Sequence, residues 1–81
     1  MLMNDVLGGG ASMVETLAEF ECKCPNRCGR VLELRVNREA RKIGLKIIDP
    51  DPEKEDTEVV FDANSVVDFI HELKNALFAI L

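Results

Sequence analysis

The chain has 81 residues, of which 47% are hydrophobic and 31% charged, and carries a formal net charge of −5 at pH 7. Its length allows one small domain, and its composition is that of a globular protein and excludes a wholly disordered one. The sequence shows no secretion signal and no apolar run of the roughly 20 residues that span a bilayer, so we expect no membrane association. Three closely spaced cysteines cannot all pair within one chain, which favours a reducing, cytoplasmic location.

The N-terminal residues 1–13 show no hydrophobic period and include a glycine run from Gly8 to Gly10. A glycine run loses much conformational freedom on ordering and offers no side chain to pack. We therefore expect residues 1–13 to form a flexible tail and residues 14–81 to form a single domain. A short apolar helix that docks on a partner is the alternative for the tail.

Four stretches alternate small or apolar residues with polar ones, which is the period of a half-buried strand. They are residues 16–24, 32–37, 42–47 and 57–61. The segments between them have turn composition, and the two prolines and clustered acids of residues 49–56 exclude a central strand there. Sequential strands joined by short turns predict an antiparallel meander with one polar face.

The last segment changes to a spacing of three and four residues, which predicts an amphipathic helix. Its apolar residues are Val66, Phe69, Ile70, Leu73, Leu77, Ile80 and Leu81. The N-terminal cap is Ser65, Asp62 or Asn64. The predicted fold class is therefore α+β, a four-stranded antiparallel β-meander followed by one C-terminal amphipathic helix packed on the apolar sheet face. This order of elements, though no residue motif, is similar to that of small single-strand-binding transcriptional coactivators, which dimerise through the helix.

The apolar arc of the predicted helix is wider than one sheet face needs. Val67 and Phe78 fall at its edge, and the chain ends on Leu81 without a polar closing turn. A broad apolar surface on a small domain usually marks an interface. We expect a homodimer through Val67, Phe78 and Leu81, whereas Leu73 lies near the centre of the arc and should pack on the sheet.

Cys22, Cys24 and Cys28 lie in a stretch of turn composition that resembles a zinc knuckle. Cys22 and Cys24 are two apart on the predicted strand and point to the same side, so three sulfurs can converge. Zinc sites usually take four ligands, and the candidates for the fourth are His71, Asp62 or a second protomer's thiol. Because the motif is incomplete, we expect Cys22 and Cys24 to be buried strand residues and expect no cofactor. A zinc site and a redox pair of Cys24 and Cys28 are the alternatives.

The middle of this acidic chain, residues 21–46, carries eight Lys or Arg against three Glu. Cations on the outward sheet face could track phosphates, because such charge supplies most non-specific nucleic-acid binding. The candidates are Lys23, Arg35, Lys42 and Lys46. Single-strand platforms also need aromatic rings for base stacking, and no Phe falls on the predicted outward face. We therefore interpret the cations as a solvated face that pairs with Glu across strands, and nucleic acid is the alternative.

Catalysis needs a base or nucleophile that partner groups hold in place, and the sequence offers one His and no Tyr. The acids of residues 49–56 lack the glycine and the spacing of a calcium-binding loop, which favours a solvated acidic loop. We expect a small non-enzymatic binding or regulatory protein that acts through contacts with a protein partner and forms a homodimer. The alternatives are a single-stranded nucleic-acid-binding protein that uses the basic sheet face and a zinc-stabilised adaptor.

Overall fold

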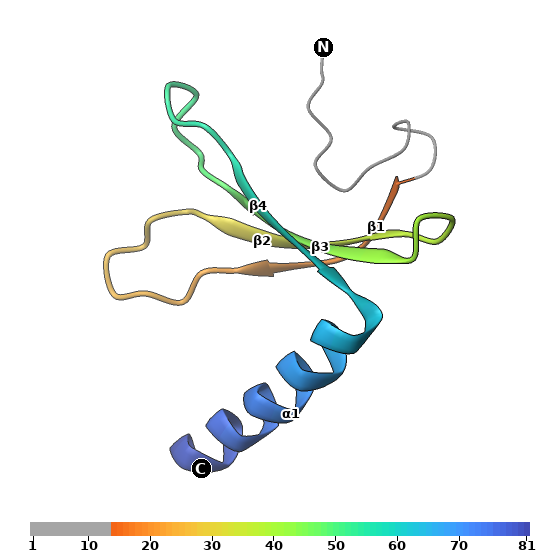
Figure 1. The fold of residues 1–81 in the computed structure, drawn as a ribbon. Helices are drawn as coiled ribbons and strands as arrows, with labels where there is room; N and C mark the ends of the chain where they lie inside the picture. The colour runs from red at the N-terminus through yellow and green to blue at the C-terminus, as the bar shows by residue number, and fades with distance from the viewer. Residues whose placement is uncertain (1–13) are drawn as a thin grey trace.

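The computed structural model describes residues 14–81, and the tail expected at residues 1–13 lies outside the described residues. Four strands precede one helix along the chain, as the sequence predicts (Figure 1). They are β1 (Val14–Glu21), β2 (Val31–Asn37), β3 (Lys42–Ile48), β4 (Thr57–Asp62) and α1 (Ala63–Ile80). The strands form one antiparallel sheet in the order β1-β2-β3-β4, which confirms the α+β class and the meander.

The strand register places the alternating apolar residues on one face of the sheet. Leu34 pairs with Leu45, and Leu45 pairs with Val59, so one apolar row crosses three strands. Residues directly opposite each other in an antiparallel pair share a face. The apolar sheet face therefore consists of Ala18, Phe20, Leu32, Leu34, Val36, Ile43, Leu45, Ile47, Val59 and Phe61.

The first strand departs from the predicted alternation in two places. Thr16 pairs with Arg35 and Ala18 with Leu34, so Leu17 is an extra residue that forms a β-bulge. The strand ends at Glu21, and the prediction that it continues to Cys24 is wrong. Proline at position 25 lacks the amide donor that a strand pairing needs, and it lies in the turn that the Arg27 amide closes on the Cys24 carbonyl.

The helix begins at a side-chain cap and touches the sheet near its start. The carboxylate of Asp62 accepts a hydrogen bond from the backbone amide of Ser65 at 2.9 Å, which makes Asp62 the N-cap among the three candidates. The Phe69 ring stacks on Phe61, and α1 has contacts with β3 and β4. Beyond this start α1 runs away from the sheet (Figure 1). Leu73 is 57% exposed, so the prediction that it packs on the sheet is wrong.

The described part of the chain encloses almost no core. Within residues 14–81 only Asn37 and Gly44 are buried, and the Asn37 side chain accepts a hydrogen bond from the amide of Ala40 in the turn after β2. The Cα radius of gyration is 14.1 Å, against about 12 Å for a compact domain of this length. One layer of sheet and one projecting helix therefore leave their apolar surfaces open. Among the described residues, no helix combines the length and the apolarity that crossing a membrane requires.

Candidate functional site

The segment between β1 and β2, residues 22–30, forms a closed loop that we call the cysteine loop. The amide of Cys22 donates to the carbonyl of Arg30 at 2.9 Å, which joins the two ends of the loop. Inside it, the amide of Arg27 donates to the carbonyl of Cys24 at 3.2 Å and closes a tight turn. Arg27 and Gly29 both adopt left-handed backbone conformations, with φ of 50° and 77°. These two residues flank Cys28 and set the direction in which it enters the loop.

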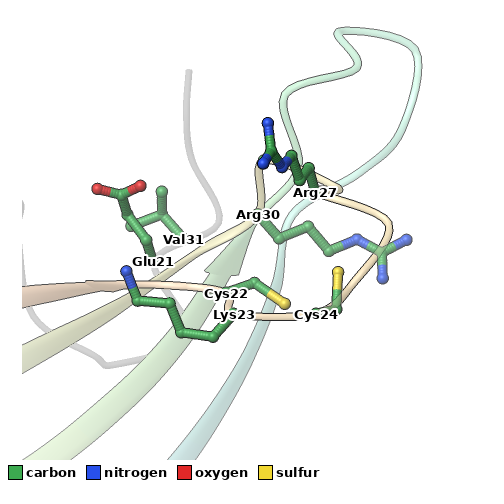
Figure 2. Close-up of a pocket in the computed structure, with 8 residues that line it drawn as sticks. Glu21, Cys22, Lys23, Cys24, Arg27, Arg30 and Val31 are labelled. Carbon is green, nitrogen blue, oxygen red and sulfur yellow. The ribbon is translucent and has the colours of Figure 1, made fainter.

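The three thiols of the cysteine loop converge. The sulfur atoms of Cys22, Cys24 and Cys28 all lie within 4.8 Å of one another. Figure 2 shows the Cys22 side chain directed towards Cys24, with both sulfurs on the side away from Glu21. Cys22 is exposed and the other two are partly exposed. The prediction that Cys22 and Cys24 are buried residues of a strand is therefore wrong, because both follow the end of β1.

Mutual contacts within the loop shift the acidity of two thiols in opposite directions. The backbone amide of Cys28, together with the thiols of Cys28 and Cys22, lowers the pKa of Cys24 to about 7. The pKa of Cys22 is raised: the backbone amide of Cys24 lowers it, but contacts with the Cys28 and Cys24 thiols, burial and the charge on Cys24 outweigh that amide. Cys24 is thus a stronger acid than Cys22, and its thiolate forms more readily.

An ion pair ties the cysteine loop to the acidic loop that joins β3 and β4. Nε of Arg30 lies 3.0 Å from a carboxylate oxygen of Asp49. The pKa of Asp49 is lowered first by the amide of Asp51, which donates to it at 2.9 Å, and then by Arg30. A methyl group placed on Gly29 would lie 3.1 Å from Cγ of Pro50, so the two loops also touch. The carboxylates at the start of residues 49–56 therefore accept hydrogen bonds from backbone amides, and Asp49 also binds Arg30.

The two side chains expected as fourth metal ligands do not join the three thiols. Among the described residues, the group of converging ligand atoms contains the cysteines and no histidine or carboxylate. Asp62 pairs with Lys42 at one end of the sheet, whereas Glu21 and Val31 pair at the other end, next to the cysteine loop. His71 lies on exposed α1. A fourth ligand from the same chain is thus not supplied by Asp62 or His71.

The four candidate phosphate contacts do not form a free basic face. Arg35 donates to both carboxylate oxygens of Glu58, at 3.1 and 3.0 Å. Lys46 lies 3.9 Å from Asp56, and by register it sits between Glu33 and Glu58 in a row that begins with Glu19. Lys42 is opposite Asp62, and Lys23 lines the hollow beside the cysteine loop. Carboxylates thus accompany three of the four cations.

The candidate interface residues of the helix are all open to solvent. Val67, Phe78 and Leu81 are 65%, 63% and 86% exposed. A shallow groove on the same helix is lined by Ile70, Leu73, Lys74, Ala76, Leu77 and Ile80. The sequence pattern did not reveal that the sheet face is also open, although Phe20, Ile47 and Val59 belong to it and are exposed. Periodicity shows which residues share a face and not what covers that face.

The described residues therefore present two candidate sites, a three-thiol loop at one end of the sheet and an open apolar surface on the sheet face and α1. The sequence pattern also did not predict the ion pair between Arg30 and Asp49, because the two residues are far apart in the sequence. Comparison with protein-family models, with curated proteins and with solved structures finds no match to the chain.

Proposed function

We propose that this chain is a small non-enzymatic protein that acts through protein contacts and assembles as a homodimer through α1 and the apolar sheet face. The observation that carries the proposal is the size of the open apolar surface. Its exposed members are Phe20, Ile47 and Val59 on the sheet, and Val67, Phe69, Ile70, Leu73, Leu77, Phe78, Ile80 and Leu81 on the helix.

The open surface is large enough for a stable dimer. A large side chain such as Phe exposes roughly 200 Å² when free, so at their exposed fractions these residues present roughly 1,300 Å². A standard protein interface buries roughly 800 Å² on each partner. Monomeric proteins of this size seldom expose contiguous apolar patches of more than a few hundred Å². The surface is therefore typical of an interface.

A second copy of the chain is the occupant that the fold favours. Stable domains bury an apolar sheet face or helix stripe against another layer, and here the single chain supplies only a partial second layer. A two-fold pairing would place the helix of each protomer against the open surface of the other and complete two layers at once. Lys74 is the one charged residue that lines the helix groove, so like charges oppose the contact little.

The polar face of the sheet supports protein contacts more than nucleic-acid binding. Its central cations have carboxylate neighbours, which lowers the potential that would attract phosphates. The stacked rings of Phe61 and Phe69 lie on the apolar side of the sheet, away from these cations. Base stacking and phosphate contacts would thus fall on different faces. For catalysis, no hydrogen bond or ion pair from residues 14–81 holds His71 of α1 in place as a base.

Analytical ultracentrifugation of the full chain at several concentrations tests the assembly. We expect a mass of two chains that falls towards one chain on dilution, because the interface is non-covalent. A single-chain mass at every concentration would contradict the homodimer. Retention of a single-stranded oligonucleotide at physiological salt would favour the nucleic-acid alternative instead.

A further inference from the structure

We propose that the cysteine loop binds one thiophilic divalent cation of the zinc class through the sulfur atoms of Cys22, Cys24 and Cys28, and leaves the fourth coordination position to an exchangeable ligand. The proposal rests on the convergence of the thiols and on the way the loop is built. It does not depend on the homodimer, because all three ligands come from one chain.

The distances between the sulfurs are close to those that a zinc ion requires. A zinc–sulfur bond of about 2.3 Å in tetrahedral geometry places neighbouring sulfurs about 3.8 Å apart. The three sulfurs lie within 4.8 Å of one another, so shifts of about 1 Å in side-chain position bring them onto one ion. Two of the three are already neighbours, since the Cys22 side chain points towards Cys24 (Figure 2).

The backbone of the loop holds this arrangement. The bond from the Cys22 amide to the Arg30 carbonyl fixes the two ends of the loop, and the turn at Cys24 fixes its middle. The left-handed conformations of Arg27 and Gly29 then return the chain so that Cys28 meets the other two thiols. A non-glycine residue pays a conformational penalty for such a φ, so its presence at Arg27 indicates a loop with a defined shape.

Positive side chains around the loop suit the charge of the bound state. Three thiolates and one divalent cation carry a net charge of −1. Arg27 and Arg30 line the hollow beside the thiols, and Arg30 is close enough to Cys28 and Cys22 to interact with both. On binding, each protonated thiol releases its proton to solvent as its sulfur forms a bond to the metal, and no group is oxidised or reduced.

The fourth position is the feature that distinguishes this site from a purely structural zinc site. Closed structural sites use four protein ligands, whereas sites with three protein ligands keep a position for water or another ligand. In the described part of the chain no fourth ligand atom converges with the thiols. A hollow of about 450 Å³ adjoins them and is open to solvent. Water, or a thiolate or carboxylate from another molecule, would therefore complete the coordination.

The obvious rival is a disulfide between two of the thiols, with the third left free. A disulfide would remove two ligands from the metal, so the two states exclude each other. Experiments on the reduced protein distinguish the metal site from the disulfide. A metal site binds its ion under reducing conditions, whereas a redox pair requires no metal ion.

Cobalt titration of the full-length chain tests the proposal. The protein is reduced with a phosphine, freed of metal with a chelator and titrated with Co²⁺, whose thiolate charge-transfer absorption reports sulfur ligands. We expect saturation at one equivalent, displacement of Co²⁺ by Zn²⁺, and a changed cobalt spectrum when a small thiol is added to fill the fourth position. Zinc should also protect all three thiols of the wild type from alkylation, a readout that needs no variant.

Serine variants provide the residue-level test, and a neighbouring loop position provides the control. Cys22→Ser, Cys24→Ser and Cys28→Ser should each weaken zinc binding by more than about 100-fold, since loss of an outer partner of a ligand alone weakens it by about 10–100-fold. Asn26→Ser lies in the same loop, keeps all three thiols and should bind zinc within a few-fold of the wild type. Phe78→Glu, which should dissociate the proposed homodimer, should still bind one equivalent, which separates this proposal from the homodimer.

Three results would overturn the metal site. The first is a reduced wild type that gives no thiolate–cobalt absorption. The second is one-equivalent binding that Cys28→Ser leaves unchanged, with zinc that fails to protect Cys28 from alkylation. The third is a reduced chain that binds no zinc but forms an intramolecular disulfide readily in air, which would assign the loop to redox chemistry.

Discussion

The ring of Phe69 in α1 stacks on the ring of Phe61 at the end of β4, with centroids 5.6 Å apart and planes inclined by 18°. Phe69 lies about two turns after the Asp62 cap, so the cap and the ring pair together set the direction in which the helix leaves the sheet. Because later residues of α1 such as Leu73 are largely exposed, this short stretch is the main junction between helix and sheet within one chain.

Removal of the ring pair should loosen this junction. We expect Phe69→Ala to lower the free energy of unfolding by about 1–3 kcal/mol, less than a fully buried Phe would lose, because Phe69 is partly exposed. Urea unfolding followed by circular dichroism measures the change. Phe78→Ala is the matched control: its effect should depend on protein concentration, since its side chain is proposed to pack on the second copy. Equal, concentration-independent losses in both variants would contradict the distinction.

A charge placed on the apolar side of α1 should split the dimer, and the same charge on its polar side should not. We expect Phe78→Glu to sediment as a single chain with its circular dichroism spectrum retained, because a carboxylate in an apolar interface is left unpaired. Asn75→Glu adds the same side chain on the polar side of the same helix and should keep the mass of the wild type. A Phe78→Glu protein that remains dimeric would show that Phe78 lies outside the interface.

Two ion pairs between Arg and Glu, Arg35–Glu58 and Arg38–Glu15, should differ in strength. Arg35 and Glu58 are 15% and 6% exposed and share two hydrogen bonds, whereas Arg38 and Glu15 meet once at 3.2 Å and are both exposed. We expect Glu58→Ala to lower the free energy of unfolding by about 2 kcal/mol, because it leaves a partly buried charge without this partner. Glu15→Ala should lower it by less than about 0.5 kcal/mol. Chemical unfolding of both variants gives the comparison, and similar losses would refute it.

The helix cap should fail in acid. The pKa of Asp62 is lowered from its ordinary value of 3.8 by the hydrogen bond from the Ser65 amide, so the folded state favours the carboxylate. The stabilisation is therefore complete above pH 3.8 and is lost as the pH falls through the lower folded value. Asp62→Asn keeps a capping oxygen but cannot titrate. Helical ellipticity measured against pH should show a smaller acid-dependent loss in this variant, and an unchanged curve would contradict the assignment.

The sequence predicts the sheet well because alternation depends on neighbouring residues alone. The pairing of Leu34 with Leu45, and of Leu45 with Val59, follows once short turns join strands of matching period. The placement of the helix was not predictable in the same way. An apolar arc centred near Leu73 indicates that something packs on it, but the chain's own sheet and the surface of a second copy are chemically alike.

The cysteine loop shows the same division between pattern and geometry. Spacing identified Cys22, Cys24 and Cys28 as candidates but favoured burial on a strand, because alternation continues through Cys24. The loop forms instead because the chain turns at Pro25 and because Arg27 and Gly29 adopt positive φ. Glycine at position 29 signals such a turn, whereas nothing in the sequence signals the positive φ at position 27.

The bulge at Leu17 also limits how far assembly can proceed. A flat sheet with an open apolar face and two free edges tends to grow strand by strand into fibres. In this protein the bulge interrupts the hydrogen-bonding row of β1, and Glu15, Glu19 and Glu21 lie along the same edge strand. The opposite edge strand, β4, carries Glu58 and Asp62, so two edges that approach each other bring carboxylates together. Growth through the edges is thereby disfavoured, and association through the faces, the contact that the proposed homodimer would use, does not depend on them.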